Sequence, residues 1–472
     1  MRVRTKNKLF MGKNTKKQID NIEDSQNNLN QGLFGLLPIK QKSVIAEFTA
    51  EKISSDGGLL ILREVENQIG IIQSIANCIT DNRHPSYVEH PLYELLAQRV
   101  YQISAGYEDA NDCNYLKDDP ILKMCVGQLP ETGKSLASQP TMSRFENQPT
   151  RTELYNIAVA FAEQFVRSYT SEPQVIILDC DDTNSDTYGG QQLTLFNDYY
   201  GEYCYMPLHI YEGLSGKLIT TILKPGRRSK GADVFAILKR LISLLRKHWK
   251  NTTIVVRGDG HFASKELMDW AHDQRKIRFM TGLTGNSLLH KLSEVKVKSA
   301  ESMFKQTGKP VKLYHSFQYQ ASSWEYSQRV IVKIEVNSMG TNIRYIVTDL
   351  HEYRTKELYE KGYCARGGME LRIKEHKLYL QSDRMSCNRF FANQMRLFLH
   401  SAAYVLIHTL QKELLRGTEY YNATMETIKL RLIKTATRVL ELKTKIKVQF
   451  PIEFPTKTTF STCMQAFEIL RC

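Results

Sequence analysis

Two apolar segments of this chain end in acidic side chains. Residues 176–178 (Ile-Ile-Leu) run into Asp179, Asp181 and Asp182, and residues 254–256 (Ile-Val-Val) lead through Arg-Gly to Asp259. Short apolar runs of this kind predict buried strands, and adjacent strands of one sheet bring such ends together. Carboxylates held in one small volume repel one another and need a cation. The alternative is that each acid only solvates a strand end or caps the following turn.

The pleat of the first strand separates its acids into two sets. Successive side chains point to opposite faces, so Asp179 and Asp181 share one face while Cys180 and Asp182 share the other. We favour Asp181 as a metal ligand, with Asp182 as its competitor. Hard oxygen ligands suit Mg²⁺, and two such ions can stabilise both the attacking and the leaving oxygen at a phosphate.

The order of the expected elements narrows the fold. Strands are predicted at 174–182, 203–211 and 217–224, followed by a helix (232–249), a strand (252–257), a helix (263–274) and a strand (277–281). Three strands followed by alternating helix and strand is the order of a ribonuclease H-like core. Residues 311–350 are richer in β-branched and aromatic side chains, which predicts a β insertion with strands at 324–336 and 342–349. The expected fold class is α/β.

The charge of the chain favours a polyanionic partner. It contains 64 Lys and Arg against 50 Asp and Glu, a net charge of +14. Seven basic side chains and no acid fall within the first 19 residues, and residues 424–447 form a second basic region. Lys and Arg gain affinity for DNA by releasing the counterions of its phosphates. A solvated tail and a solubilising helix face are the alternative.

Composition excludes several classes of protein. The longest apolar stretch, residues 398–410, is short of the ~20 residues that cross a bilayer. The nine cysteines include no Cys-x-x-Cys pair, so neither a disulfide framework nor a zinc ribbon is indicated. No motif for an ATP-binding loop, an acyl-transfer serine or a zinc protease is present. We expect a reduced, cytoplasmic protein without a membrane partner.

A third acidic site lies between residues 363 and 377. Tyr363, Arg366, Glu370 and Lys377 fall at offsets 0, 3, 7 and 14, within about 60° of one helix face. The two basic side chains would flank the carboxylate and could grip phosphates, Arg by a planar fork and Lys as a point charge. A Gly-Gly pair weakens the helix, so the single-face argument is firm only from Met369 onward. The alternative is a basic, solvated helix with ordinary i,i+4 pairs.

This spacing, Tyr-x2-Arg-x3-Glu-x6-Lys, preceded by a strand-end Asp-x-Thr and an Asp-Gly, resembles that of the DDE transposases of bacterial insertion sequences. More narrowly, it is similar to the branch with the Tyr-Arg-Glu-Lys signature, whose core is ribonuclease H-like with a β insertion before the Glu. The resemblance covers roughly residues 174–415, and segments 136–141, 144–147 and 205–208 are similar to one subgroup. It implies that Asp181, Asp259 and Glu370 are the catalytic, metal-binding triad, holding two Mg²⁺ ions for which Mn²⁺ can substitute.

The resemblance also implies contacts with DNA. Tyr363, Arg366 and Lys377 would lie near the cleaved phosphate. Trp324, at the start of an insertion strand, would stack on a base displaced near the transposon end. The alternative for Trp324 is a core position in a small sheet.

Four segments are expected along the chain: a basic, flexible N-terminal segment (1–45), a helical DNA-binding region (46–170), the catalytic core (171–430) with its β insertion at about 305–350, and a basic C-terminal segment (431–472). Helices are expected from about residue 369 to about 447. The helical region would carry much of the specific recognition of DNA.

The expected function is DNA transposition by a nucleoid-associated bacterial protein. The chain would bind the terminal inverted repeats of its insertion sequence, cut the ends by metal-dependent hydrolysis, and join the freed 3′-OH to target DNA. Two copies would meet on DNA as a homodimer. The alternatives are a ribonuclease H-like metal-dependent nuclease or resolvase, and a transposase-derived DNA-binding regulator without catalysis. An intact carboxylate trio argues against the regulator, since a pure binder has no reason to keep like charges together.

Overall fold

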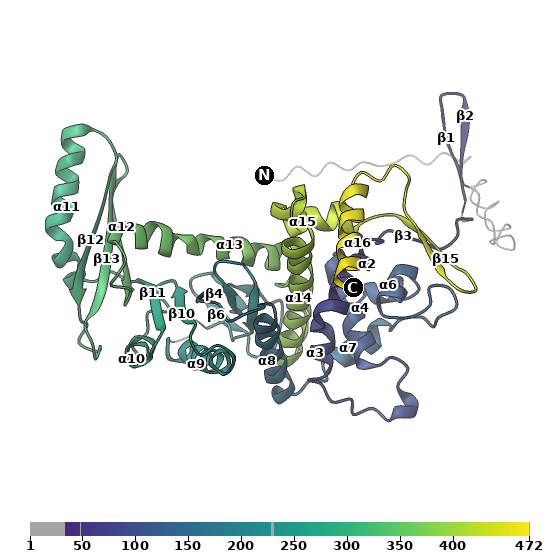
Figure 1. Cartoon of the computed structure of the whole chain (residues 1–472), viewed down its shortest axis with the longest axis horizontal. Helices are drawn as coiled ribbons and strands as arrows, with labels where there is room; N and C mark the ends of the chain where they lie inside the picture. Colours follow the sequence, from purple (N-terminus) through teal and green to yellow (C-terminus); the bar gives the residue numbers. More distant parts are fainter. Residues whose placement is uncertain (1–33, 48, 228–230, 472) are drawn as a thin grey trace, which may run out of the picture.

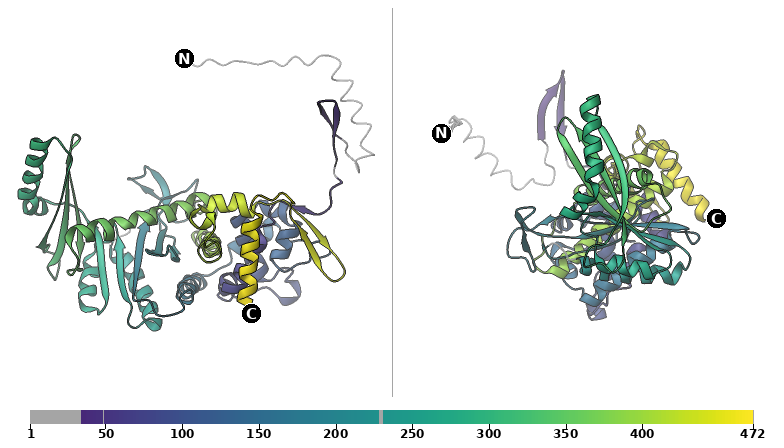
Figure 2. Two further views of the ribbon diagram at one scale, coloured as in Figure 1. Left: turned by 45° about the horizontal axis from the view of Figure 1, so that its top comes forward. Right: turned by 90° about the vertical axis from the view of Figure 1, so that its left-hand side faces the viewer.

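The computed structural model describes residues 34–47, 49–227 and 231–471 (Figure 1). A large mixed β-sheet with its helices lies at one end of the molecule and a helical body at the other. One long helical run, in green, connects them (Figure 2). This arrangement confirms the prediction of an α/β protein. In the part of the chain that the structure describes, no helix is long and apolar enough to cross a membrane.

The large sheet has eight strands in the order β12-β13-β14-β11-β10-β4-β8-β9. β4, β10 and β11 run parallel to one another, and every other neighbouring pair is antiparallel. The strands are β4 Val175–Asp182, β8 Leu208–Glu212, β9 Leu218–Ile222, β10 Thr253–Gly258, β11 Ile277–Leu283, β12 Val311–Tyr319, β13 Gln328–Asn337 and β14 Gly340–Thr348.

Helices α9 (Gly231–His248) and α10 (Lys265–Asp273) separate β9, β10 and β11 in the chain, in the predicted order. One predicted strand, 203–211, is divided in two. A small second sheet of β5 (Ser185–Asp186), β6 (Leu195–Asn197) and β7 (Glu202–Tyr205) precedes β8. Pro207 lies at the division. Proline interrupts a strand because it has no N–H to donate to the neighbouring strand.

The predicted β insertion extends the large sheet instead of forming a separate one. A helix that the sequence did not predict, α11 (Ser287–Thr307), precedes it, and its three strands join the sheet through the pairing of β14 with β11. Trp324 does not open a strand, since β13 starts only at Gln328. Its indole packs edge-on against the ring of Tyr319, with centroids 5.3 Å apart.

Alternation along the central strands sorts the two faces of the sheet. Ile176 and Leu178 of β4 pack into the same cluster as α9 and α10. Ile177 belongs to a cluster on the other face, together with Leu358 and Tyr359 of the long helical run. Because the period of a strand is two residues, the odd-numbered acids of β4 point toward that run.

The long helical run consists of α12 Thr355–Glu357, η3 Leu358–Tyr363, η4 Cys364–Arg366, α13 Gly367–Lys374 and η5 Glu375–Tyr379. It continues through the Gly-Gly pair, where Gly367 has φ −54° and ψ −23°, values of a right-handed helix. η3 and η5 are π-helical turns. Packing of the run against the sheet therefore outweighs the low helix propensity of glycine.

The helical body has one hydrophobic core that reaches from Leu59 to Phe467. The elements that contribute are drawn from both ends of the chain: α2 Leu59–Ile69, α3 Ile71–Ala76, α4 Leu92–Ala105, α5 Asp112–Leu116, α6 Pro120–Cys125, α7 Gln139–Glu146, α8 Arg151–Arg167, α14 Phe390–Thr409, η6 Leu410–Leu414, η7 Glu419–Asn422, α15 Met425–Ile428, η8 Lys429–Ile433 and α16 Lys457–Arg471. The short turn η2 (Pro85–Tyr87) lies between α3 and α4 in the chain and buries no residue. The segments predicted as separate, 46–170 and 431–472, thus pack into one body around α14.

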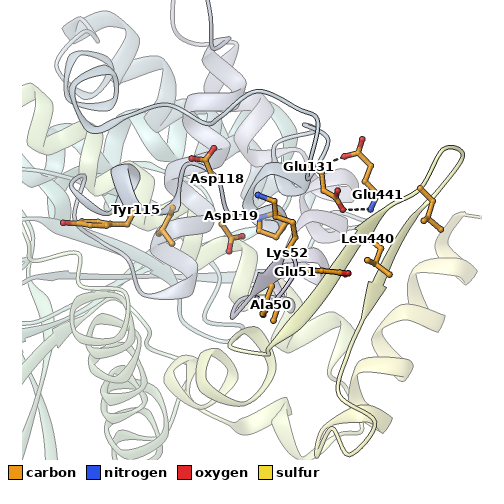
Figure 3. A pocket seen from close by; sticks show the side chains of 13 residues that line it. Ala50, Glu51, Lys52, Tyr115, Asp118, Asp119, Glu131, Leu440 and Glu441 are labelled. Atoms are coloured by element: carbon orange, nitrogen blue, oxygen red, sulfur yellow. Dashed lines mark hydrogen bonds between the residues drawn. The ribbon is translucent and has the colours of Figure 1, made fainter. Parts of the chain in front are cut away.

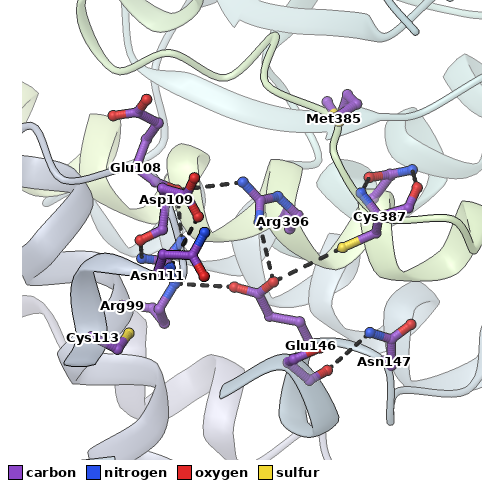
Figure 4. A network of polar contacts seen from close by, with 12 residues as sticks. Arg99, Glu108, Asp109, Asn111, Cys113, Glu146, Asn147, Met385, Cys387 and Arg396 are labelled. Atoms are coloured by element: carbon purple, nitrogen blue, oxygen red, sulfur yellow. Dashed lines mark hydrogen bonds and ion pairs between the residues drawn. The ribbon is translucent and has the colours of Figure 1, made fainter. Parts of the chain in front are cut away.

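A buried network of charges ties this body together (Figure 4). The carboxylate of Glu146 on α7 lies 3.0 Å from Nε of Arg99 on α4 and 3.3 Å from Nη1 of Arg396 on α14. All three side chains are at least 96% buried. Glu146 belongs to the segment 144–147 that the sequence singled out, and this network gives that segment a structural role.

The C-terminal segment contains strands where helices were expected. β15 (Thr437–Glu441) pairs with β16 (Ile446–Gln449) and with β3 (Ile53–Ser54). Thr437 and Val439 are buried and Arg438 between them is exposed, the period-two pattern of a half-buried strand. A hollow of about 870 Å³ lies beside β15 (Figure 3), where the Glu441 carboxylate accepts the N–H groups of Glu131 and Thr132. The acids of this hollow therefore hold β15 to the body.

The N-terminal segment is described only in part. Residues 1–33, which carry most of the predicted basic and flexible segment, lie outside the described residues. Residues 34–46 form the antiparallel hairpin of β1 (Phe34–Ile39) and β2 (Lys42–Ala46), so this part of the segment has regular structure.

Candidate active site

The acids singled out from the sequence line one cavity of about 470 Å³. Asp181 comes from the end of β4, Asp259 directly follows β10, and Glu370 lies on α13. β4 and β10 pair in parallel with Gly258 opposite Cys180, so the next residues, Asp259 and Asp181, emerge side by side. Asp182, Asn197, Tyr199, Tyr200, Met206, His261 and Phe262 complete the lining.

Asp181 is a largely buried carboxylate that faces the long helical run. Its Oδ2 accepts a hydrogen bond from Nη2 of Arg366 at 3.0 Å. Burial raises the pKa of Asp181 to about 7, against the lowering effect of Arg366, and the charges of Asp259 and Asp182 raise it further. A cation that enters the cavity would therefore stabilise the ionised form of this carboxyl group.

Asp182 has a different partner. Both of its carboxylate oxygens accept hydrogen bonds from Nζ of Lys224, at 2.7 Å each. This ion pair is largely buried, with 9% of the Lys224 side chain and 14% of the Asp182 side chain exposed. Asp182 is thus already neutralised by Lys224, which lies two residues beyond the end of β9, whereas Asp181 points to the helical run.

Asp259 is oriented by its own turn. Oδ1 accepts the backbone N–H of His261 at 2.9 Å, and Oδ2 lies 2.7 Å from Nδ1 of the His261 ring. Gly282 of β11 lies directly beneath this turn. A Cβ added at Gly282 would come within 2.8 Å of the backbone nitrogen of Gly260 and 2.9 Å of Oη of Tyr363. The strand end, the turn and the helical run therefore meet at a point where only glycine fits.

The four residues of the signature divide between two places. Arg366 lies between Asp181 and Glu370, with Nη1 3.9 Å from the Glu370 carboxylate, and Tyr363 reaches the turn that follows β10. Lys377 lies one step away, where Nζ donates to the backbone oxygen of Asn184 at 2.6 Å and to its Oδ1 at 3.0 Å. Asn184 follows β4 by two residues. The signature thus follows the edge of the cavity and continues beyond the end of β4.

Comparison with known proteins identifies the family of this chain. Residues 36–472 match the sequence model described as Transposase DDE domain group 1. The chain belongs to this family of DDE transposases. No curated protein matches the chain significantly. Among solved structures, it is similar to a piggyBac transposase in a synaptic complex with hairpin DNA, at 11% identity and a TM-score of 0.43, with 80% of each chain covered.

The DDE domain contains a structural ion pair that the sequence did not identify. Nε and Nη2 of Arg257 donate to the two carboxylate oxygens of Asp179 at 2.5 and 2.7 Å, and Nη1 donates to the backbone oxygen of Gly362 at 2.5 Å. Both side chains are almost completely buried. Arg257, held by Asp179, therefore fastens the long helical run to the sheet, and Asp181 is the acid of that face of β4 that reaches the cavity.

A second buried group lies under the far part of the run. His376 of η5 is within 3.3 Å of Nδ1 of His209 on β8 and 3.2 Å of Oη of Tyr211. Burial lowers the pKa of His209 to about 3 and that of His376 well below its usual value, so both rings are neutral. His209 is the cross-strand partner of Asp181. The neutral cluster thus packs the long helical run against β8, the strand that pairs with the one carrying Asp181.

The donor set of the cavity suits a hard cation. Carboxylate oxygens are the ligands that Mg²⁺ takes in proteins, and four carboxylate side chains line one cavity here: Asp181, Asp182, Asp259 and Glu370. Among the described residues, however, no group of three or more His, Cys, Asp and Glu side chains is arranged closely enough to hold a metal ion. The guanidinium of Arg366 stands between two of these acids, 3.0 Å from Asp181 and 3.9 Å from Glu370. Trp324 does not line the cavity.

Proposed function

We propose that this chain is a DNA transposase that cuts the ends of its own bacterial insertion sequence and joins them to target DNA. The observation that carries the proposal is the single cavity lined by Asp181, Asp259 and Glu370, which come from two adjacent strand ends and the facing helix. The order β9-β8-β4-β10-β11, with β4, β10 and β11 parallel, supports a ribonuclease H-like core. The positions of Tyr363, Arg366 and Lys377 support the Tyr-Arg-Glu-Lys branch.

Asp181, Asp259 and Glu370 would hold divalent metal, Mg²⁺ in the first place, with Asp182 as the competitor of Asp181. The metal would neutralise phosphate charge and activate the attacking oxygen. Arg366 would release Asp181 and turn its guanidinium to a phosphate, for which its Nε is suited, because this nitrogen is buried without a hydrogen-bond partner among the described residues. The His261 ring would keep the Asp259 carboxylate aimed into the cavity.

The reaction would consist of two in-line displacements. In the first, a water oxygen attacks the phosphorus at the end of the element, the bond from phosphorus to O3′ breaks, and O3′ leaves as a free 3′-OH. In the second, that 3′-OH attacks a target phosphorus and displaces another O3′. Each step exchanges one ester oxygen for another or for water, so no nucleotide triphosphate is consumed.

The decisive variants remove one carboxylate at a time. Glu370→Ala should abolish cleavage of terminal-repeat DNA in Mg²⁺ while end binding, measured by gel shift, stays within a few-fold, because Lys and Arg position the phosphates. Glu357→Ala is the matched control: Glu357 is an exposed glutamate of the same helical run that pairs with Lys361 at 2.9 Å. Near-normal cleavage by Glu370→Ala would show that the triad assignment is wrong.

The first acid has its own test. Asp181→Asn should be inactive and Asp182→Asn should lose less, since Asp182 is bound to Lys224. An active Asp181→Asn with an inactive Asp182→Asn would transfer the role to Asp182.

Two copies of the chain are required to act on two ends at once. One chain offers one such cavity, so a homodimer on DNA is the simplest assembly. The net charge of +14 disfavours self-association until DNA neutralises it. Light scattering with terminal-repeat duplex should show two chains with two ends. A one-chain complex that completes concerted two-end joining would refute the dimer, and one that only nicks would favour a nuclease.

A further inference from the structure

The large sheet ends in a strand with an open edge. β12 is the outermost strand on its side, and among the described residues no strand pairs with its outer edge. It is nine residues long, contains no proline, and buries only Tyr319, whereas β13 behind it is mostly buried. An open edge presents unpaired backbone N–H and C=O groups, so a long one without proline is a template for another strand. Figure 1 shows β12 at the end of the molecule opposite the helical body.

The helix α11, which packs on β12 and β13, exposes a row of apolar side chains. At 100° per residue four of them lie within about 80° of one another on the helix surface. This apolar stripe consists of Leu288 (49% exposed), Leu292 (44%), Val295 (77%) and Met303 (44%). Single exposed apolar residues are normal, whereas four on one stripe indicate a surface that binds another molecule.

Two interactions show which way the apolar stripe faces. Glu301 accepts a hydrogen bond from Oγ1 of Thr341 on β14 at 2.9 Å, so its side of α11 faces the interior strands. Lys296 lies on the other side, near β12, because the pKa of His315 is lowered by burial and by the charge of Lys296. On the helix the stripe adjoins Lys296 and lies almost opposite Glu301. The apolar stripe and the open edge of β12 therefore face the same way, outward from the sheet.

The helix that carries the stripe is fixed in place. Oδ1 of Asn286 accepts the N–H of Leu289 at 2.9 Å, and Nδ2 of Asn286 donates to Oη of Tyr319 at 3.0 Å. Oγ of Ser293 lies 2.8 Å from Oη of Tyr345 in a buried contact. Because the cap and the packing side are both anchored to strands, the stripe is preorganised, which reduces the entropy lost on binding.

We propose that the open edge of β12 and the apolar stripe of α11 form an interface with a second copy of this chain. The two β12 strands would pair antiparallel about a twofold axis perpendicular to the sheet, which joins the two large sheets into one. The same axis would bring the two α11 helices side by side on one face, with their stripes in contact. A second copy thus satisfies the backbone edge and the apolar stripe with one operation. The inference deepens the two-chain assembly of the proposed function and rests on that function only for the role of the dimer.

The charges at this edge set the strength of the interface. Lys296 and His315 face the same way as the stripe, so those of one copy would approach those of the other. A lysine at a sheet edge weakens edge-to-edge pairing. The interface should therefore be weak in the free protein and become stronger when salt screens these charges or DNA neutralises them.

The test measures the mass of the DNA-free chain by sedimentation equilibrium in about 1 M NaCl, where charges are screened beyond about 3 Å. The wild type should pass from one chain to two as its concentration rises. The double variant Leu292→Asp/Val295→Asp should associate at least about tenfold more weakly, because it would bury unpaired carboxylates. Lys298→Asp is the matched control. It makes the same change of charge on the same helix, at an exposed side chain outside the stripe that pairs with Glu294, and it should associate like the wild type.

Two further measurements make the result specific. Lys296→Met should strengthen association at about 0.1 M NaCl at least about threefold, because it removes a repulsion across the twofold axis. Hydrogen exchange of the backbone amides of residues 311–319 should slow as the wild type associates, and should not slow in the double aspartate variant, because strand pairing protects amides. Circular dichroism of the double variant should match that of the wild type, since both replaced side chains are exposed.

A wild type that stays a single chain in about 1 M NaCl and on terminal-repeat duplex would overturn the proposal, and so would equal association of the double aspartate variant. Association without slower exchange at residues 311–319 would refute the strand pairing and with it the proposed interface. Unchanged association together with weaker duplex binding by the double variant would assign the stripe to DNA instead. Cleavage of terminal repeats in Mg²⁺ is measured separately: a two-chain species in high salt without any cleavage would keep the interface and refute the proposed function.

Discussion

Glu146 is the residue whose replacement should destabilise the chain most clearly. Its carboxylate is the shared partner of Arg99 and Arg396, whose side chains are 0% and 4% exposed. In Glu146→Gln the shape is kept, but two buried guanidinium groups lose their counter-charge. Removing one partner of a buried ion pair is destabilising by about 3–5 kcal/mol, because the remaining charge stays desolvated. Here two charges remain, so we expect the upper part of that range.

The measurement is urea denaturation followed by far-ultraviolet circular dichroism. The matched control is Glu163→Gln, since Glu163 pairs with His248 at 3.0 Å in a contact where about a third of each side chain is exposed. Such surface pairs contribute about 0–1 kcal/mol. A triple variant with Arg99→Met, Arg396→Met and Glu146→Leu should recover much of the loss, because apolar replacement of a whole buried ion cluster is often neutral. A loss below about 1 kcal/mol in Glu146→Gln would refute the reasoning.

Three other outcomes are expected. Gly282→Ala should reduce cleavage strongly but spare DNA binding, because its Cβ would push against the turn that carries Asp259, and a cleavage assay beside a gel shift would show the difference. Burial raises the pKa of Glu66 to about 7, so the stability that its protonated form provides is complete below pH about 4.5 and is lost as the pH rises through 7. The free energy of unfolding of Glu66→Gln should therefore equal that of the wild type near pH 4.5 and exceed it at pH 8 by about 3 kcal/mol at most. Equal free energies of unfolding at pH 8 would contradict this. A fragment of residues 1–170 should lack a cooperative thermal transition, since its core includes α14 and α16, whereas cooperative unfolding of the fragment would show that it is self-sufficient.

The parts of the fold that depend on local pattern could be predicted from the sequence. The apolar runs before Asp181 and Asp259 become β4 and β10, and the amphipathic segments between strands become α9 and α10. The alternation of side chains in β4 also places Asp181 and Asp182 on opposite faces, as predicted. Once a strand is located, its period of two determines the face on which each side chain lies.

The parts that depend on distant partners could not be predicted. Lys224 neutralises Asp182 from 42 positions away, and Arg257 fixes Asp179 through a contact that neither segment reveals alone. The basic residues around β15 favour a helix, and the alternation of buried and exposed residues in β15 is too short to predict a strand. Its pairing with β3 depends on a distant segment. Aromatic residues favour strands, which predicts a strand at Trp324, whereas the chain turns there before β13 begins.

The shared core of the helical body has a consequence for how the chain is made. α2 ends at residue 69 and α16, which packs against it, begins 388 positions later, at residue 457. Ribosomes add about 5–20 residues per second, so α2 waits roughly 20–80 s for this partner. The eight-stranded sheet lies wholly between the two and can fold first. The part of α2 that α16 covers remains open to chaperones and proteases throughout that interval, so slower translation lengthens its exposure.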